Sequence, residues 1–338
     1  MPINRQWILK SRPSGMVSTD NLAYRESDMP NTELNDGEVL VRNKIFACMP
    51  AMRTWMNADS EYFPPIPLGA PVTAPAVAEV VTSNNPRFKA GTLVSGLTGW
   101  EDYSLVSKNN FFISPLPEGI DPLDALTILG GNAITAYFGL LKVGEPKDGE
   151  TVVVTGAAGS TGSLVCQIAK IKGCRVIGIA GGPEKCKWLL DEANIDAAID
   201  YKSEDVAARL KELCPKGVDV FFDNVGGTIM QDVIDQMAMY GRCVMCGQIA
   251  HYNTPGPAPG PRDMFRVISH RLRIQGFISS DFMKDRKEAL TDLSAWARAG
   301  KLAHQVDMRE GFKNLPETYF ELFSGGNNGT LLLKVDEA

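Results

Sequence analysis

The stretch TVVVTGAAGSTGSLVCQIAKIKGCRVIGIAGGPEK, residues 151–185, decides the fold of this chain. It opens with an apolar, β-branched run at 151–155, which is typical of a strand buried on both faces of a sheet. A glycine-rich turn over 156–162 leads into an amphipathic helix predicted over 163–171, and a second apolar strand follows at 175–180. This order of elements within about thirty residues predicts the βαβ unit that binds dinucleotides.

The small residues of the turn have separate roles in such a unit. Gly159 lets the main chain approach a pyrophosphate, and Gly162 lets the helix pack closely on the strand. The N–H groups at the helix start then bind the anion. Ala157 stands where the usual pattern has its first glycine. A glycine turn can also be a connection that binds nothing, but the flanking strands and helix supply the context that a nucleotide site requires.

The chain beyond this unit continues to alternate strands with helices. Strand patterns occur at 197–200, 218–223, 242–247 and 272–278. Helix patterns begin at 183 and cover 203–213, 228–237 and 283–299. Such alternation predicts an α/β fold with a doubly wound parallel sheet, the Rossmann arrangement.

Residues 1–124 follow a different pattern, with short apolar runs separated by Gly, Pro and Asn. The clearest runs are at 38–46, 76–82 and 92–98. They predict a β-rich, barrel-like domain, to which a strand predicted at 330–335 is expected to return. We therefore expect a substrate domain formed by 1–124 and 306–338, and a nucleotide-binding domain formed by 125–305.

Composition limits the classes of partner. The chain has 338 residues, 44% of them hydrophobic, and a formal net charge of -6. Because there is no basic surplus to neutralise phosphates, we expect no nucleic-acid partner. The segment 1–15 has charges inside its only apolar run, so it resembles neither a signal peptide nor a transit peptide. No window is long and apolar enough to span a membrane, and we expect a cytoplasmic protein.

Metal ligands are sparse in this sequence. The seven cysteines are scattered, and the three histidines are His251, His270 and His304. Cys243 and Cys246 have a redox or metal spacing, but they lie in an apolar run without a second pair, so buried strand cysteines are the favoured interpretation. We expect no metal site and no disulfide framework.

The end of the second strand predicts which cofactor is bound. Units that prefer NAD place an acidic side chain there, where it binds the ribose hydroxyls. This chain has Ala180-Gly181-Gly182 instead, which leaves room for a 2′-phosphate. Lys185 follows as a cation that can meet this phosphate. A lysine at a helix start is by itself more often solvated, but its position after the small residues favours NADP.

Two later strands end in further candidates for cofactor binding. Asn224 follows the strand 218–223, at the edge of the sheet where ligands of parallel sheets bind. A glycine turn with an Asx cap explains the same residues equally well. The strand 242–247 leads to Tyr252, which offers a phenol at this edge, although an isolated tyrosine more often serves packing.

Long segments across nearly the whole chain resemble one family. They are INRQWILKSRP at 3–13, DGEVLVRN at 36–43, TAYFGLLKVGEPKDGETVVVTGAAG at 135–159, GIAGGPEKC at 178–186, AAIDYK at 197–202, FFDNVGG at 221–227, CGQIAHYN at 246–253 and RLRIQGFI at 271–278. On these motifs the sequence resembles the zinc-independent branch of the medium-chain dehydrogenase/reductases. Within that branch it is similar to the prostaglandin reductase and curcumin reductase family of NADPH-dependent double-bond reductases.

The resemblance implies a GroES-like catalytic domain, a Rossmann domain and NADPH bound in the cleft between them. Lys185 and Tyr201 match contacts to the 2′-phosphate, and Tyr252 and Tyr62 match tyrosines near the enone, which makes these two the catalytic candidates. The residues that match cofactor contacts are Gly159, Ser160, Thr161, Gly162, Lys185, Tyr201, Asn224, Cys246, Gly247, Tyr252, Phe277, Ile278, Ser279 and Asn327.

Three segments depart from the family pattern, and all three belong to the substrate side in that pattern. They are Met49–Arg53 in place of DPYMR, Val72–Ala76 in place of a glycine-rich run, and Gly131–Ala133 in place of a Met-Pro-Gly run. Retained cofactor residues beside altered pocket residues predict the same hydride chemistry on an unusual substrate. Neutral repacking is the alternative explanation.

The sequence thus predicts an NADPH-dependent ene-reductase of α,β-unsaturated ketones or aldehydes. Hydride is expected to reach the β-carbon, with the Tyr252 phenol donating to the carbonyl oxygen and a tyrosine or water protonating the α-carbon. We also expect a homodimer. A carbonyl or quinone reductase on the same scaffold and a non-catalytic NADPH-binding protein are the two alternatives.

Overall fold

The chain divides into two compact units. The computed structural model describes residues 2–61, 63–107, 113–256 and 260–336. Unit 1 comprises Met1–Leu126 and Val306–Ala338, and unit 2 comprises Thr127–Gln305. None of the helices in the described residues is long and apolar enough to cross a membrane.

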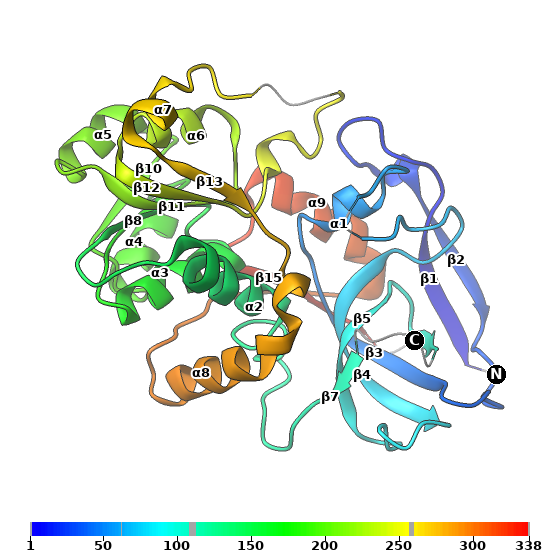
Figure 1. Ribbon diagram of the computed structural model, residues 1–338. Coiled ribbons are helices and arrows are strands. Elements are labelled where there is room, and N and C mark those ends of the chain that lie inside the picture. The colour runs from blue at the N-terminus through cyan, green and yellow to red at the C-terminus, as the bar shows by residue number, and fades with distance from the viewer. Residues whose placement is uncertain (1, 62, 108–112, 257–259, 337–338) are drawn as a thin grey trace. The chain divides into compact units, whose positions relative to one another are not determined.

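Unit 1 is built on an antiparallel-rich sheet (Figure 1). The strand order is β14-β15-β3-β4-β5-β7, with β6 paired to β3. These strands are β3 (Val39–Ala47), β4 (Thr73–Ser83), β5 (Leu93–Gly99), β6 (Tyr103–Val106), β7 (Ile113–Pro115), β14 (Val306–Glu310) and β15 (Thr330–Lys334). The strand β15 pairs antiparallel with β3, so residues 330–334 belong to the same sheet as residues 39–47.

Short elements complete unit 1 around an aromatic core. A hairpin of β1 (Ile3–Leu9) and β2 (Leu22–Asp28) forms a separate two-stranded sheet. The helices are α1 (Met52–Trp55) and α9 (Leu315–Ser324), with single turns η1 (Thr19–Asn21) and η5 (Phe312–Asn314). Large buried side chains from these elements and from the loops pack together, among them Trp55, Trp100, Phe312 and Tyr319.

Unit 2 is a doubly wound parallel sheet, and this confirms the predicted fold class. Its order is β10-β9-β8-β11-β12-β13, and every neighbouring pair is parallel. The strands are β8 (Thr151–Thr155), β9 (Arg175–Ala180), β10 (Ala197–Asp200), β11 (Val218–Asp223), β12 (Met237–Met245) and β13 (Arg273–Gly276). The chain runs outward from β8 to β10 and then returns to β11, so the order reverses between β8 and β11.

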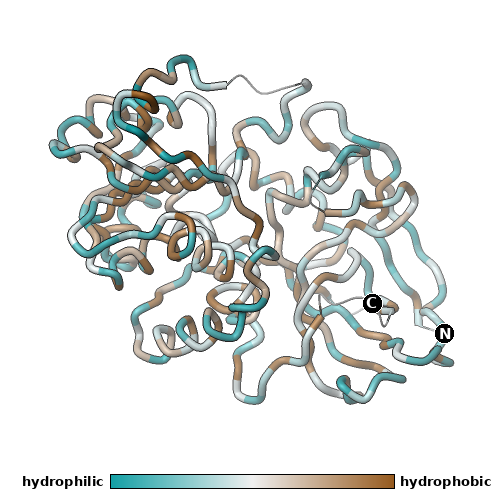
Figure 2. Tube along the Cα trace, in the orientation of Figure 1, coloured by the Kyte–Doolittle hydropathy of each residue, from teal (hydrophilic) through white to brown (hydrophobic). Residues whose placement is uncertain are grey.

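Helices cover both faces of this sheet, because successive strand residues point to opposite sides. Val152 and Val154 pack in one cluster with residues of α2 (Gly131–Phe138), α3 (Ser160–Ile171), α4 (Pro183–Asp191) and α8 (Arg286–Arg298). Val153 packs on the other side with residues of α5 (Val206–Leu213) and α6 (Gly227–Ile234). Figure 2 shows the hydrophobic residues concentrated in the central strands.

Several boundaries differ from those predicted. Helix α3 begins at Ser160, three residues earlier than expected, because Gly159 is its N-cap. Helix α6 ends at Ile234 and β12 already begins at Met237, with Tyr240 at a positive φ of 61°. Helix α8 begins at Arg286, after the 3-10 helix η4 (Ser279–Asp285).

The remaining elements of unit 2 are short. They are the π-helical turn η2 (Gly139–Gly144), the 3-10 turn η3 (Ile249–His251) and the helix α7 (Phe265–His270). Helix α7 and helix α9 of unit 1 were not predicted from the sequence. The residues 124–143 have a helical sequence pattern that Gly130-Gly131 interrupts. In the structure only its second half is helical, because α2 begins at Gly131 and η2 continues it directly, whereas 124–130 form turns and a bend.

Candidate functional site

The candidate site of unit 2 begins with the turn between β8 and α3. Gly156 has a positive φ of 59°, and Gly159 caps α3 in an extended conformation. A Cβ on Gly162 would lie 2.2 Å from the Gly156 carbonyl oxygen, so only glycine allows this helix to approach the strand so closely. The first N–H groups of a helix have no intrahelical partner, and no side-chain hydrogen bond caps α3 in the described residues. These N–H groups can bind an anion.

Ser160 in this turn has a partner that the sequence did not indicate. Asn132 of α2 donates from Nδ2 to the Ser160 hydroxyl oxygen at 2.9 Å. An accepted hydrogen bond leaves the serine O–H available to a phosphate oxygen. Asn132 belongs to one of the three segments that depart from the family pattern, and the resemblance placed that segment on the substrate side. In the structure its side chain supports the predicted pyrophosphate turn.

The end of β9 forms a second small-residue surface. A Cβ on Gly181 would lie 2.8 Å from the ring of Tyr201, so the tyrosine covers the bare main chain of the glycine. Tyr201 is 46% exposed and therefore accessible to a ligand. Lys185 is half-buried in the first turn of α4. The two residues predicted to meet a 2′-phosphate thus border the same turn.

Asp200 at the end of β10 is a residue that the sequence analysis missed. Its Oδ1 accepts hydrogen bonds from the N–H groups of Gly182 at 2.8 Å and Lys202 at 3.0 Å. The bond from Gly182 and then that from Lys202 hold the pKa of Asp200 below its usual value, so the carboxylate stays ionised. It fixes the turn that carries Gly181 and Gly182. The AIDYK pattern, with an acid after an apolar strand, was the only available signal.

The turn after β11 lies beside the β8 turn. A Cβ on Gly156 would be 3.5 Å from both Asn224 Cβ and Val225 Cγ2, which places the two turns in contact at the point where strand order reverses. Asn224 is half-buried, and its Nδ2 donates to the Thr155 carbonyl at 2.7 Å. In open parallel sheets, ligands bind at this reversal of strand order.

The loop after β12 brings Tyr252 to the same edge. The Tyr252 hydroxyl accepts a hydrogen bond from the Gln248 N–H at 3.2 Å, across the 3-10 turn η3. The N–H groups of Cys246 and Gly247 both donate to the Asp223 carbonyl, so the start of the loop is anchored on β11. An accepted hydrogen bond polarises the phenol O–H and favours donation from it.

His251 is the neighbour of Tyr252 and its rival as a donor. Its Nε2 is buried and has no hydrogen-bond partner among the residues that the structure describes. A Cβ on Gly227 would lie 3.8 Å from this nitrogen, so the ring is directed toward the β11 turn. The two adjacent side chains thus have different surroundings.

The remaining predicted residues are placed as follows. Phe277 follows β13, and its ring lies against Gly139, where a Cβ would be 2.3 Å from it. Ile278 is exposed, and Ser279 begins η4. Asn327 lies in unit 1, where its Nδ2 donates to the Gly329 carbonyl at 2.8 Å. Tyr62 lies outside the described residues.

Cys243 of β12 and Cys246, which follows the strand, do not form a common site. Cys243 packs with Phe221 on one face of the sheet, whereas Cys246 packs with Phe222 on the other. Burial raises the pKa of each thiol to about 12, and the nearby Asp223 adds to both shifts. Both cysteines are therefore protonated at neutral pH. In the described residues no group of three or more His, Cys, Asp or Glu side chains could hold a metal ion.

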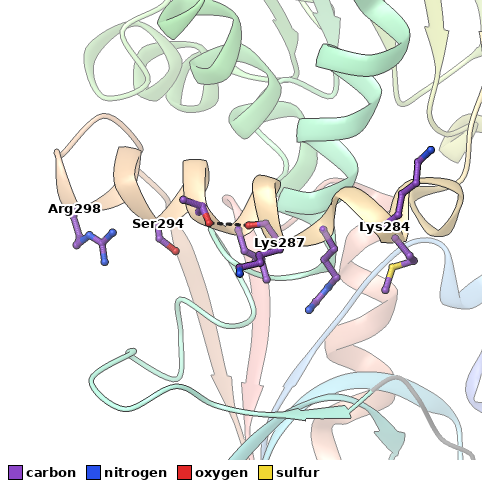
Figure 3. Close-up of a pocket in the computed structure, with 8 residues that line it drawn as sticks. Lys284, Lys287, Ser294 and Arg298 are labelled. Carbon is purple, nitrogen blue, oxygen red and sulfur yellow. Dashed lines mark hydrogen bonds between the residues drawn. The ribbon is translucent and has the colours of Figure 1, made fainter.

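A shallow hollow of about 650 Å³ lies on α8 and the end of η4, as Figure 3 shows. It is lined by polar and basic side chains, with Lys284, Lys287, Ser294 and Arg298 among them. None of its lining residues belongs to the turns at the sheet edge. The nucleotide site is therefore indicated by the turn geometry.

These turns fit a dinucleotide. The main chain is bare at Gly159 and at Gly182, and a Cβ on Gly182 would meet nothing within 4 Å. The uncapped start of α3 offers N–H donors. No acidic residue follows β9 directly, and Lys185 and Tyr201 are at hand for a 2′-phosphate.

Comparisons with known proteins agree with this geometry. Residues 5–114 match the family described as "N-terminal domain of oxidoreductase", and residues 160–296 match "Zinc-binding dehydrogenase". The NADPH-dependent curcumin reductase of Escherichia coli (strain K12) is 36% identical, with 98% of this chain and 97% of the relative covered. Prostaglandin reductase 1 of Rattus norvegicus is 36% identical, with 98% of each chain covered.

A solved structure extends the similarity to the fold. The crystal structure of CurA in complex with NADPH from Vibrio vulnificus is 35% identical and superposes with a TM-score of 0.91. The match covers 99% of this chain and 100% of that chain. The chain therefore belongs to the curcumin reductase and prostaglandin reductase family of medium-chain oxidoreductases, as its motifs predicted.

Proposed function

We propose that this protein uses NADPH to reduce the C=C bond of an α,β-unsaturated ketone or aldehyde. The observation that carries the proposal is the sheet edge of unit 2, where bare glycine turns meet at the reversal of strand order. Small residues after β9, with Lys185 and Tyr201 beside them, suit the 2′-phosphate of NADPH. The full-length similarity to curcumin and prostaglandin reductases supports the enone as substrate.

The family resemblance supports a role for each of these residues. Gly159 to Gly162 hold the pyrophosphate on the start of α3, and Asn224, Cys246, Gly247 and Phe277 to Ser279 hold the rest of the cofactor. Asn327 is a further contact from unit 1. Unit 2 thus binds the nucleotide, and unit 1, the GroES-like domain, holds the substrate.

The chemistry needs one donor to the substrate oxygen. When bound, NADPH supplies the hydride that is added to the β-carbon. Negative charge then develops on the carbonyl oxygen as an enolate, and the Tyr252 phenol donates a hydrogen bond to it. A proton from water or from Tyr62 completes the reduction at the α-carbon, which gives the saturated carbonyl compound.

Further properties belong to the same proposal. The reaction is independent of zinc, because Cys243 and Cys246 are protonated and pack on opposite faces of the sheet, which does not suit a metal. We also propose a cytoplasmic homodimer. The departures at 49–53, 72–76 and 131–133 favour a substrate that differs from those of the relatives. Val72, Ala74 and Ala76 are buried in unit 1, so part of the change at 72–76 is repacking of its core.

Product analysis tests the proposal directly. The protein is incubated with NADPH and a panel of enones and enals, and the products are identified by NMR. We expect the saturated ketone or aldehyde. An allylic alcohol would establish the carbonyl reductase alternative, and oxidation of NADPH by quinones alone would establish a quinone reductase. Tight NADPH binding with no oxidation by any acceptor would favour a non-catalytic binding protein.

A further inference from the structure

Three hydrogen bonds join the ends of β8 and β11 at the reversal of strand order. Thr155 donates from Oγ1 to Asp223 Oδ1 at 2.6 Å, and the same Oγ1 accepts from the Asn224 N–H at 2.9 Å. The Asn224 side chain returns the contact by donating to the Thr155 carbonyl at 2.7 Å. The strand register aligns Phe222 with Val154, so Thr155 and Asp223 are the next pair along the two strands. The parallel pairing of β8 and β11 therefore brings the Thr155 hydroxyl within hydrogen-bond distance of the Asp223 carboxylate.

The Asp223 carboxylate accepts hydrogen bonds from the main chain of the turn after β11. Its Oδ1 also accepts from the N–H groups of Val225 at 2.9 Å and Gly226 at 3.0 Å. The side chain is fully buried, and no Lys or Arg among the described residues forms an ion pair with it. A buried carboxylate without a cation is costly unless several donors satisfy it, so neutral donors alone hold this one in place. Thr155 provides the shortest of these hydrogen bonds.

This network determines how the Asn224 amide is oriented. Because Nδ2 donates to the Thr155 carbonyl, the side-chain oxygen must point away from that carbonyl. No described residue donates to this oxygen, although Asn224 is half-buried. The amide therefore presents an acceptor at the edge of the sheet, next to the β8 turn.

We propose that Thr155 and Asp223 are positioning residues that hold Asn224 so that its side-chain oxygen accepts a hydrogen bond from NADPH. The inference rests on the proposed function for the cofactor and adds two residues that the motif comparison did not assign. Thr155 acts through Asn224 and Asp223, because its hydroxyl is already engaged with both. Thr155 therefore contributes to NADPH affinity as well as to the stability of the fold.

The experiment compares Thr155→Val, Thr155→Ser and wild type. NADPH affinity is measured by fluorescence titration at about 20 °C, well below the melting temperatures of about 45–65 °C that are usual for mesophilic domains. Valine has the same shape as threonine but removes the hydroxyl, and we expect NADPH binding to weaken about tenfold. Serine keeps the hydroxyl and should restore the affinity to within about threefold of wild type. The KM for NADPH should rise with Thr155→Val, while kcat at saturating NADPH changes by less than about threefold.

Thr98→Val is the matched control. Thr98 is a buried threonine of unit 1 whose hydroxyl donates to Asn43 Oδ1 at 2.8 Å, so its loss also removes a buried hydrogen bond. We expect it to lower the melting temperature as Thr155→Val does but to leave NADPH affinity unchanged. The proposal is overturned if Thr155→Val binds NADPH as tightly as wild type while both variants melt earlier.

A second variant decides the question if Thr155→Val does not fold. Asp223→Asn keeps the size of the side chain but replaces one acceptor oxygen by an NH2 group. This group faces either the donors at Oδ1 or the Gly226 N–H, which also donates to Oδ2 at 3.1 Å, so NADPH affinity should fall. Unchanged affinity in a folded Asp223→Asn protein would overturn the proposal. Failure of the wild type to bind NADPH is a separate result, since it would refute the proposed function before any variant is compared.

Discussion

Two turns at the same edge of the unit 2 sheet are built in opposite ways. The β8–α3 turn depends on missing side chains, since a Cβ on Gly162 would lie 2.2 Å from the Gly156 oxygen. The loop after β12 depends on a side chain, since the Tyr252 hydroxyl accepts from the Gln248 N–H and closes the turn η3. One turn is defined by main chain, and the other is organised around a phenol.

The difference explains how one scaffold can keep a cofactor while its chemistry varies. A site made of main-chain N–H groups tolerates changes at most side chains but none that adds atoms at a critical glycine. A loop whose reactive group is one hydroxyl can lose its reactivity by a single substitution, while its start stays anchored by the N–H groups of Cys246 and Gly247 on the Asp223 carbonyl. Variants of each turn should therefore fail differently.

The largest effect is expected for Gly162→Ala. The added methyl group overlaps the Gly156 carbonyl oxygen, so α3 must move away from β8. We expect the free energy of unfolding to fall by about 3 kcal/mol, the scale of overpacking a close contact. If that displacement is carried to the anion site, NADPH binding weakens by about a hundredfold. Thermal melts and cofactor titration measure the two losses.

Gly131→Ala is the control for this variant in the stability measurement. A Cβ on Gly131 meets nothing within 4 Å, and this residue begins α2. Because alanine favours a helix over glycine, the melting temperature should hold or rise slightly. A Gly162→Ala protein as stable as Gly131→Ala, with normal NADPH affinity, would show that the turn is not defined by close main-chain packing.

Tyr252→Phe tests the other turn. If the phenol donates to the developing enolate, turnover of a good enone should fall by about tenfold to a thousandfold. NADPH affinity should stay nearly intact, because the N–H groups of Cys246 and Gly247 still anchor the start of the loop on the Asp223 carbonyl. Steady-state kinetics and a cofactor titration on the same preparation measure both quantities. Tyr240→Phe is a control, since Tyr240 is 64% exposed on β12.

Two rival donors make this test sharper. His251 has a buried Nε2 without a partner in the described residues, and Tyr62 is the second tyrosine that matches the family. His251→Ala and Tyr62→Phe are therefore measured alongside. The assignment to Tyr252 is wrong if Tyr252→Phe turns over at the parent rate while either of the other variants abolishes turnover.

The same contrast determines how much the sequence could predict. The β8 turn was predicted with its strands and helix, because glycine spacing and apolar periodicity are local properties of the chain. The fold class and the family were predicted correctly for the same reason. The start of α3 was placed three residues late, because the apolar periodicity that marked the helix begins after Ser160, Thr161 and Gly162.

Contacts between distant segments could not be predicted in this way. Asp223 stood in a recognised motif, but its partner Thr155 is 68 residues away and becomes visible only in the paired strands. Asn132 was noted as a departure from the family pattern, whereas its bond to Ser160 depends on how α2 packs beside α3. The carboxylate of Asp200 is likewise occupied by the turn after β9, which is known only from the structure.

A smaller effect is expected at the β9 turn, where a side chain supplements a bare main chain. Lys185→Ala should weaken NADPH binding by roughly 1.5 to 3 kcal/mol, the scale of a hydrogen bond between charged groups, and should barely change NADH binding. Lys187→Ala is the matched control, because Lys187 is exposed and paired with Asp191. Equal losses for both cofactors with Lys185→Ala would refute its role at the 2′-phosphate.

The smallest expected effect is that of a chelator, and it tests whether the β12 loop works through its phenol alone. Zinc binds thiolates, yet burial raises the pKa of Cys243 and Cys246 to about 12 and their side chains pack on opposite faces of the sheet. Binding one ion would require both thiols to lose a proton in an apolar setting and one of them to leave its cluster. Dialysis against a strong chelator should therefore leave turnover and melting temperature unchanged. If elemental analysis instead finds stoichiometric zinc, and turnover disappears with its removal and returns with its addition, a metal acts in this loop. The contrast between a main-chain turn and a phenol-based loop would then be wrong, because a metal would polarise the carbonyl in place of Tyr252.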